Sequence, residues 1–235
     1  MKKSRIFMIG ALALSLFASS GCGSMTNTGK GALIGGGGGG ALGAGLGALI
    51  GGGKGAGIGA AIGAAVGSGA GALIGNRMDK QKKQLEESLA NSAEVSTVTD
   101  QNGLKAIKVT FNGGILFPTN GTTLSANAKK DLTAFATSLI DNPQTNVQIY
   151  GFTDNTGTMA VNQRVSDGRA DAVRTYLLNS GVAANRLTAQ GLPMQDYVAS
   201  NDTAEGRAQN RRVEIYISAD ADMIKAAENG TLATN

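Results

Sequence analysis

Residues 147–181, VQIYGFTDNTGTMAVNQRVSDGRADAVRTYLLNSG, decide the fold of the second half of the chain. The stretch begins at 147–150, where apolar and polar residues alternate as in a half-buried strand. A polar loop follows, and residues 161–179 have a helical pattern that Ser180-Gly181 closes. The stretch therefore predicts a strand, a short polar loop and a long helix.

The sequence on either side predicts more elements of the same domain. Ser125 is a plausible N-cap for a helix that ends at Asn142-Pro143, and Gln101-Asn102-Gly103 is a hairpin turn signal. Further strands are predicted at 94–100, 104–111, 186–190 and 213–218. Strands that alternate with two helices indicate an α+β fold, a mixed sheet with both helices packed on one face.

Composition excludes several classes of function. The 235 residues include no histidine and one cysteine, so a Ser-His-Asp site, a Cys-His site and an ordinary His/Cys zinc site are excluded, as is an intrachain disulfide. The net charge of +4 includes Lys2, Lys3 and Arg5, which lie in a segment that we expect to be removed. Without them 18 basic residues face 17 acidic ones, a balance of +1, which gives no broad basic field for nucleic acid.

The first residues have the pattern of a secretory signal peptide. A basic start is followed by an apolar run at 6–17, which is short for a membrane span, and then by small residues up to Cys22. This arrangement resembles a bacterial lipobox, although Ser19 stands where leucine is usual. Two interpretations are open. Either Cys22 is acylated and anchored in lipid, or the signal peptide is cleaved nearby and leaves a free thiol.

Glycine is concentrated in residues 31–75, which hold 21 of the 36 glycines. Within them a glycine recurs at every fourth position from Gly31 to Gly75, and Lys54 is the single charge between residues 31 and 76. A period of four places glycines in a stripe where a second helix can approach, and about 45 apolar residues suit two spans. The segment resembles a glycine zipper and predicts an α-helical hairpin. A disordered Gly-rich spacer is the alternative.

The segment at 77–93 is richer in charge, and we interpret it as a polar helix or linker with a solvated face. The tail after 218 gives no clear signal beyond a frayed helix. The predicted organisation is a signal peptide (1–21), a lipidated linker (22–30), a glycine-zipper segment (31–76), a polar helix or linker (77–93), a C-terminal domain (94–218) and a tail (219–235).

Three motifs in the C-terminal domain resemble one known family. Residues 151–157, GFTDNTG, resemble the G-H-T-D-x-x-G segment of the OmpA-like peptidoglycan-binding family, and 162–170, NQRVSDGRA, resemble its N-x-x-L-S-x-x-R-A helix. Residues 201–214, NDTAEGRAQNRRVE, resemble its N-x-T-x-x-G-R-x-x-N-R-R-V-E motif. With Cys22 and the glycine zipper, the whole chain resembles outer-membrane lipoproteins of the YiaD type.

The resemblance implies a ligand and the residues that bind it. The ligand is the diaminopimelate of the cell-wall stem peptide, which has an ammonium and a carboxylate on one carbon. Asp154 matches the family's receptor for the ammonium and Arg169 its receptor for the carboxylate. The predicted ligand-binding residues are Asp154, Arg169, Thr153, Asn155, Asn162 and Arg212.

Structural roles stay open for some of these residues. Asn162 is also a candidate cap of the loop, and Arg211 and Arg212 are candidate ion-pair partners at the start of a strand. Two departures from the family pattern concern Phe152, at a position where histidine is common, and Gly168, which lies inside a helix beside Arg169. We expect the first to remove a polar contact and the second to loosen Arg169.

The sequence thus predicts an outer-membrane lipoprotein with a periplasmic domain that binds peptidoglycan, without catalytic residues, metal or cofactor. An enzyme that cleaves wall glycan is a weaker hypothesis, because Asp154 has no acidic partner in the motifs. A wall-anchored assembly, stator or efflux component is the other alternative. In that case the zipper forms a membrane element or a homo-oligomer.

Overall fold

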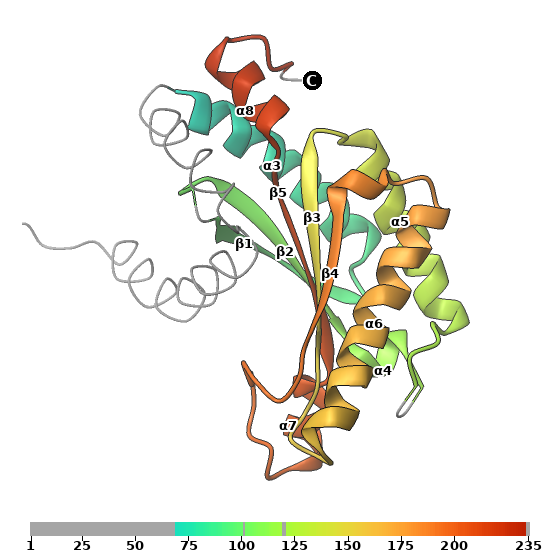
Figure 1. The fold of residues 1–235 in the computed structure, drawn as a ribbon. Coiled ribbons are helices and arrows are strands. Elements are labelled where there is room, and N and C mark those ends of the chain that lie inside the picture. The colour runs from blue at the N-terminus through green and yellow to red at the C-terminus, as the bar shows by residue number, and fades with distance from the viewer. Residues whose placement is uncertain (1–68, 101, 119–120, 234–235) are drawn as a thin grey trace, which may run out of the picture. The chain divides into compact units, whose positions relative to one another are not determined.

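The computed structural model describes residues 69–100, 102–118 and 121–233 (Figure 1). Five strands form one sheet in the order β1-β2-β5-β3-β4, in which β3 and β4 are parallel and the other neighbours are antiparallel. This confirms the predicted α+β fold with a mixed sheet. The elements are α3 (Ala70–Ser88), β1 (Ala93–Thr99), β2 (Lys105–Asn112), α4 (Gly113–Leu116), α5 (Ala126–Asp141), β3 (Thr145–Phe152), α6 (Met159–Asn179), a 3-10 turn (Ala184–Arg186), β4 (Leu187–Leu192), α7 (Ala204–Asn210), β5 (Arg212–Ala219) and α8 (Ala221–Glu228).

The two faces of the sheet differ in what they bury. Val109, Ile215 and Ile149 lie side by side on three neighbouring strands and are fully buried in the main core. The residues that alternate with them face the other side, where Tyr150 and Tyr216 pack edge to face with ring centroids 5.7 Å apart. Period-two alternation therefore divides each strand between a face that helices cover and a face that carries no helix core among the described residues.

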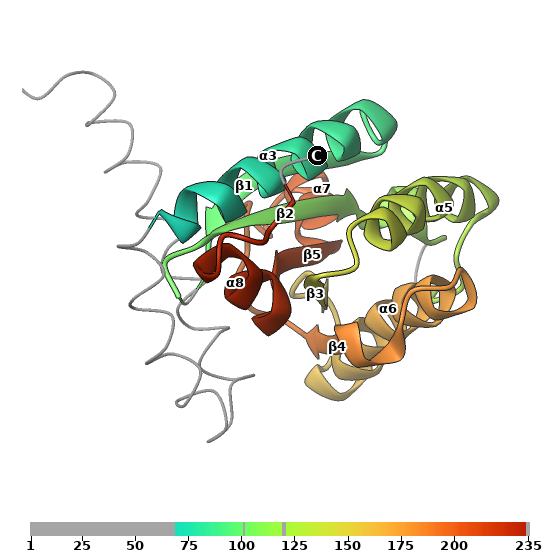
Figure 2. The same ribbon diagram turned by 90° about the horizontal axis from the view of Figure 1, so that it is seen from above.

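Helices α5 and α6 cover the main core, as the sequence predicts (Figure 2). The Ser125 hydroxyl accepts a hydrogen bond from the Ala128 N–H at 3.0 Å, which confirms the predicted N-cap of α5. Thr158 caps α6 in the same way, accepting from the Val161 N–H at 3.4 Å. Each cap satisfies an N–H group that has no partner within its own helix.

Helix α3 adds a third helix to this face. It begins at Ala70, inside the segment predicted as the zipper, and ends at Ser88 within the predicted polar linker. Ile74, Met78 and Leu85 are fully buried in the same core as the sheet. The apolar residues of α3 are sparse and many charged ones lie between them, so the sequence pattern suggested a solvated helix. The domain therefore begins about 25 residues earlier than predicted.

The tail after β5 also belongs to the domain. Asp220 caps α8 by accepting a hydrogen bond from the Met223 N–H at 2.8 Å. Met223 is fully buried, and Arg77 of α3 donates to the Ala233 carbonyl at 3.0 Å. The tail therefore packs along α3 as an ordered helix and is not frayed.

Glycines on two strands allow α6 to lie unusually close to the sheet. Gly151 and Gly191 pair across β3 and β4. A Cβ on Gly151 would overlap the Ser166 carbonyl, and one on Gly191 would overlap the Ser166 hydroxyl. Asp167 strengthens the contact, because its Oδ1 accepts a hydrogen bond from the Gly191 N–H at 2.8 Å. This contact fixes the depth at which the following residues of α6, Arg169 included, lie against the sheet.

The signal peptide, Cys22 and most of the glycine segment lie outside the described residues. Within residues 69–233 as described, no helix is both long enough and apolar enough to cross a membrane. The hairpin predicted for the zipper therefore stays a prediction, apart from residues 70–75, which form the first turns of α3.

The role of α3 in the core can be tested by truncating one side chain. Leu85→Ala removes a fully buried side chain and should lower the free energy of unfolding by about 2–5 kcal/mol. Lys83→Ala, on the exposed side of the same helix, should change it by less than about 0.5 kcal/mol. Urea denaturation followed by circular dichroism measures both. Equal, small effects would mean that α3 is not part of the core.

The close contact of α6 with the sheet can be tested at glycines. Gly151→Ala should destabilise the domain by about 1–3 kcal/mol, because the new methyl group overlaps backbone. Gly75→Ala in α3 is the control. Its Cβ would meet Lys105 Cε at 3.8 Å, an ordinary contact, so helix propensity should raise stability by up to about 1 kcal/mol. Thermal unfolding of the two variants should shift in opposite directions.

Candidate functional site

The loop after β3 holds the carboxylate of Asp154 in a fixed position. Asp154 Oδ1 accepts a hydrogen bond from the Thr156 N–H at 2.8 Å, and Gly157 supplies the positive φ of 89° that the turn needs. The side-chain amide of Asn162 donates to the carbonyls of Thr156 and Thr158 at 2.8 and 3.1 Å. Asn162 therefore braces the loop, in agreement with the structural alternative for this residue.

Arg169 reaches this site from α6 and is almost fully buried, with 3% of its surface exposed. Its Nε donates to the Gly121 carbonyl at 3.1 Å, and its Cζ lies 5.3 Å from the centre of the Phe117 ring. Its Nη1 is buried and has no hydrogen-bond partner among the described residues. A buried guanidinium N–H without an acceptor is rare in folded proteins and costly, so this atom is a candidate donor to an anionic ligand.

Arg211 is the third charged residue of the site. Its Nη1 lies 2.6 Å from Asp154 Oδ2, and its side chain is 39% exposed whereas that of Asp154 is 8% exposed. Burial alone would raise the pKa of Asp154, but hydrogen bonds from Arg211 and Thr156 outweigh it and hold the pKa below its ordinary value. Burial, followed by the charge of Arg211, lowers the pKa of Arg169, and Asp154 opposes this effect. The three charges therefore lie within electrostatic range of one another.

Two other predicted residues, Thr153 and Asn155, connect this loop to residues 193–203. Thr153 Oγ1 accepts a hydrogen bond from the Met194 N–H at 3.1 Å, and the Asn155 N–H donates to Asn201 Oδ1 at 3.3 Å. Met194 has a positive φ of 51°, which a non-glycine residue seldom adopts. Thr153 is buried, so the bond from Met194 gives its side chain a role in holding the neighbouring loop.

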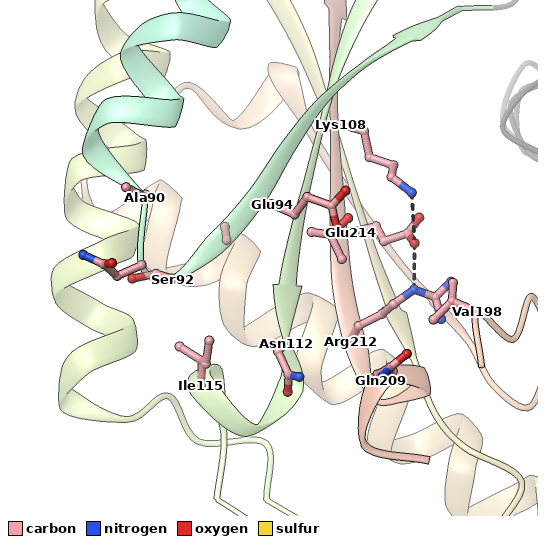
Figure 3. A pocket seen from close by; sticks show the side chains of 13 residues that line it. Ala90, Ser92, Glu94, Lys108, Asn112, Ile115, Val198, Gln209, Arg212 and Glu214 are labelled. Atoms are coloured by element: carbon pink, nitrogen blue, oxygen red, sulfur yellow. Dashed lines mark hydrogen bonds and ion pairs between the residues drawn. The ribbon is translucent and has the colours of Figure 1, made fainter. Parts of the chain in front are cut away.

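Arg212 alternates along β5 with Val213 and Ile215 of the main core, so it lies on the other face of the sheet, where Figure 3 shows it beside Glu214. Its Nε binds Glu214 Oε1 at 2.7 Å, and its Nη2 donates to the Asp196 carbonyl at 2.9 Å. The side chains of Arg212 and Glu214 are almost fully buried. Together with Lys108 they line a hollow of about 550 Å³. The structure thus separates the adjacent arginines, with Arg211 at the charged site and Arg212 bracing the fold.

Phe152 belongs to the face of Arg212 as well. The Arg212 Cζ lies 3.9 Å from the centre of the Phe152 ring, close enough for a cation–π interaction. Phe152 thus gives Arg212 an aromatic surface on this face.

Gly168 has a different role from the one expected. A Cβ there would lie 2.9 Å from Thr122 Cγ2, in the loop that precedes α5. The missing side chain makes room for this loop, whose Gly121 carbonyl accepts the hydrogen bond from Arg169. The glycine therefore helps to hold the loop against Arg169, although it reduces helix propensity.

Several residues of the site had no clear signal in the sequence. Phe117 and Gly121 lie about 50 residues before Arg169, and no motif joins them to it. Arg211 lies inside the N-R-R motif, where the sequence predicts mainly an ion-pair partner at the start of a strand. Which way the side chains of Arg211 and Arg212 point depends on the residue at which β5 begins, and the sequence does not fix that residue.

The different roles of the two arginines predict different costs of removal. Arg212→Ala leaves Glu214 buried without its main partner and should cost about 3–5 kcal/mol of stability. Arg211→Ala breaks a partly exposed pair and should cost no more than about 1 kcal/mol. Urea denaturation of the two variants measures the difference. Comparable costs would contradict this division of roles.

Family models match both parts of the chain. The OmpA family model matches residues 116–211, which include Asp154, Arg169 and Arg211. A model of the YMGG-like Gly-zipper matches residues 1–79, up to the first turns of α3.

Similar proteins and solved structures agree with these matches. The probable lipoprotein YiaD of Escherichia coli (strain K12) is 38% identical over 220 residues, which are 92% of this chain and 99% of that protein. The peptidoglycan-binding protein ArfA of Mycobacterium tuberculosis is 40% identical over 113 residues, 48% of this chain and 35% of that one.

Two solved structures share the fold. A putative MotB-like protein from Desulfovibrio vulgaris has a TM-score of 0.54 at 27% identity, covering 63% of this chain and 94% of that one. The cell wall anchor of the T6SS from Pseudomonas aeruginosa has a TM-score of 0.51 at 30% identity, covering 58% of this chain and 97% of that one. Together with the likeness to YiaD over nearly the whole length of both chains, these matches show that the chain belongs to the OmpA family, in the group that joins an OmpA-like domain to a YMGG-like glycine zipper.

Proposed function

We propose that this protein is an outer-membrane lipoprotein whose C-terminal domain binds peptidoglycan non-covalently through diaminopimelate. In this way it tethers the membrane to the cell wall. The observation behind the proposal is the buried Nη1 of Arg169, which has no acceptor among the described residues, within electrostatic range of the Asp154 carboxylate.

The charges of the site match one end of diaminopimelate. The free end of this residue has an ammonium and a carboxylate on one carbon, so its binding site needs an acceptor and a planar donor close together. Asp154 is a fixed acceptor, and the Arg169 guanidinium has one N–H group, at Nη1, without an acceptor in the part of the chain that the structure describes. A ligand carboxylate at Nη1 would remove an unsatisfied donor that costs about 1–3 kcal/mol, and the new bond would be charge-assisted.

The position of the site within the domain suits a tether. The chain enters through α3, where Asp79 pairs with Lys105 at the start of β2, with Nζ and Oδ2 2.6 Å apart. Asn112, at the other end of β2, is the strand-pairing partner of Arg212 on β5. Arg212 follows Arg211, so this end of β2 marks the position of the site. A strand rises about 3.3 Å per residue, so the entry and the site are separated by roughly 20–25 Å. Figure 1 agrees, with the start of α3 and that of α6 at opposite ends of the sheet.

The membrane attachment is proposed to be lipid on Cys22. A protein named a probable lipoprotein matches 92% of the chain, and Cys22 follows small residues as in a lipobox. Several acyl chains would bind a bilayer stably, at about 0.8 kcal/mol per buried CH₂ group, whereas a single chain binds marginally. In this proposal the mature protein begins at Cys22, and the domain from Gly69 onward lies in the periplasm.

The glycine zipper is proposed to associate with membrane or with copies of itself. Its match to the YMGG-like Gly-zipper model supports a helical segment in preference to a random spacer. In the alternative function, the zipper belongs to a larger assembly that the OmpA-like domain holds on the wall. The likeness to a T6SS cell wall anchor supports that alternative at the level of the domain.

The proposed site can be tested by pulling down the full mature protein with diaminopimelate-containing peptidoglycan in mild detergent. Asp154→Ala and Arg169→Ala should each weaken binding at least about tenfold, because each removes one partner of a charged hydrogen bond. Arg164→Ala is the control, since Arg164 is an exposed arginine of α6. Unchanged co-sedimentation of both site variants, with their fold intact by circular dichroism, would remove the site from this proposal.

A further inference from the structure

The charged site has one more cation than the free end of diaminopimelate can use. Asp154 is one anion, and Arg169 and Arg211 are two cations within its range. A ligand with one ammonium and one carboxylate would leave the site with an unbalanced positive charge. A ligand with one ammonium and two carboxylates would balance it, because the second carboxylate matches the second arginine.

We propose that Arg211 is the receptor for a second carboxylate of the stem peptide and is paired with Asp154 only until the ligand arrives. This inference rests on the proposed function, because it concerns the same site. In this proposal the site contacts the free end of diaminopimelate and also the residue that follows or precedes diaminopimelate in the stem peptide. Arg211 then acts as a specificity determinant in addition to Asp154 and Arg169.

The geometry around Asp154 makes exchange of partners straightforward. Asp154 Oδ1 is already bonded to the Thr156 N–H, and Arg211 occupies Oδ2 at 2.6 Å. A ligand ammonium that approaches Oδ2 meets the Arg211 guanidinium, and the two like charges repel. The ammonium therefore takes over the contact with Asp154 as Arg211 moves away, and the released guanidinium is free to bind an anion.

Arg211 is anchored at its backbone and exposed at its side chain, as an exchanging residue should be. Its N–H donates to the Arg207 carbonyl at 3.1 Å, and its carbonyl accepts from the Gly113 N–H at 2.7 Å. A Cβ on Gly113 would overlap that carbonyl, so the glycine allows the contact. The side chain is 39% exposed, so it can move without unpacking the core, whereas Arg169 at 3% exposure cannot.

A free carboxylate near diaminopimelate can come from two sources in a stem peptide. One is the α-carboxylate of the γ-linked D-glutamate before it, and the other is the terminal carboxylate of the D-alanine after it. The probe is the tetrapeptide L-Ala-γ-D-Glu-diaminopimelate-D-Ala. Two derivatives are used beside it, one amidated at the glutamate α-carboxylate and one at the alanine carboxylate. Calorimetry with the full mature protein in detergent gives the dissociation constant for each.

The expected result is that one of the two amides binds the unchanged protein about tenfold more weakly than the parent peptide. With Arg211→Gln that difference should disappear, because the receptor for the carboxylate is gone. Arg211→Gln also removes the residue that competes with the ligand for Asp154, so the variant's affinity for the parent peptide can change for that reason alone. The affinity of each amide is therefore compared with that of the parent peptide within the same protein. Arg164→Gln, an equal change of charge on the exposed side of α6, should keep the full difference.

Two results would overturn the inference, and they can be told apart. If the affinity of each amide relative to the parent peptide is the same for the unchanged protein and for Arg211→Gln, Arg211 is not a carboxylate receptor. Binding of the parent peptide would then still support the wall-binding function. If the parent peptide does not bind the unchanged protein at all, the proposed function itself is wrong. The derivative that loses affinity identifies which neighbour of diaminopimelate the site recognises.

Discussion

The close contact between α6 and the strands β3 and β4 sets the geometry of the domain. It requires two paired glycines, Gly151 and Gly191, because any side chain there would overlap Ser166. The contact lies one turn before Arg169, so the same packing that builds the core also decides how deeply the guanidinium is buried. Asp154 lies two residues after the end of β3, and its loop is held by α6 through Asn162. The acceptor and the donor of the site are therefore positioned by one helix–strand unit.

The two adjacent arginines show how one strand can serve two purposes. Arg212 is the first residue of β5 and forms a buried ion pair with Glu214 on the face of the sheet opposite the main core, where Phe152 supports it. A buried pair of this kind adds little net stability, but removing one partner is costly, so it constrains the start of β5. Arg211, just before the strand, is then directed to Asp154. The structural pair thus fixes the residue next to it, whose partly exposed side chain can exchange partners.

Helix α3 joins the glycine segment to the OmpA-like domain without an intervening linker in the described residues. The glycine register continues through Gly71 and Gly75 into a helix that is packed on the core through Ile74 and Met78. Tension on the N-terminal side would therefore act on α3 directly, and the ordered helix α8 packs beside it. This arrangement suits the proposed tether, because the start of α3 and the start of α6 lie at opposite ends of the sheet (Figure 1).

Local patterns determined much of this protein. Alternating strands and the cap at Ser125 were enough to predict the mixed sheet, α5 and α6, because these signals depend on nearby residues. Asp154 and Arg169 were chosen because three motifs resemble the OmpA-like family, and no local pattern predicted that the two side chains lie near each other. Only the tertiary structure decided which arginine meets Asp154, since side-chain direction at the start of β5 depends on where pairing begins. It also placed α3 in the core, because a few apolar residues among many charges become informative only when a partner surface is present.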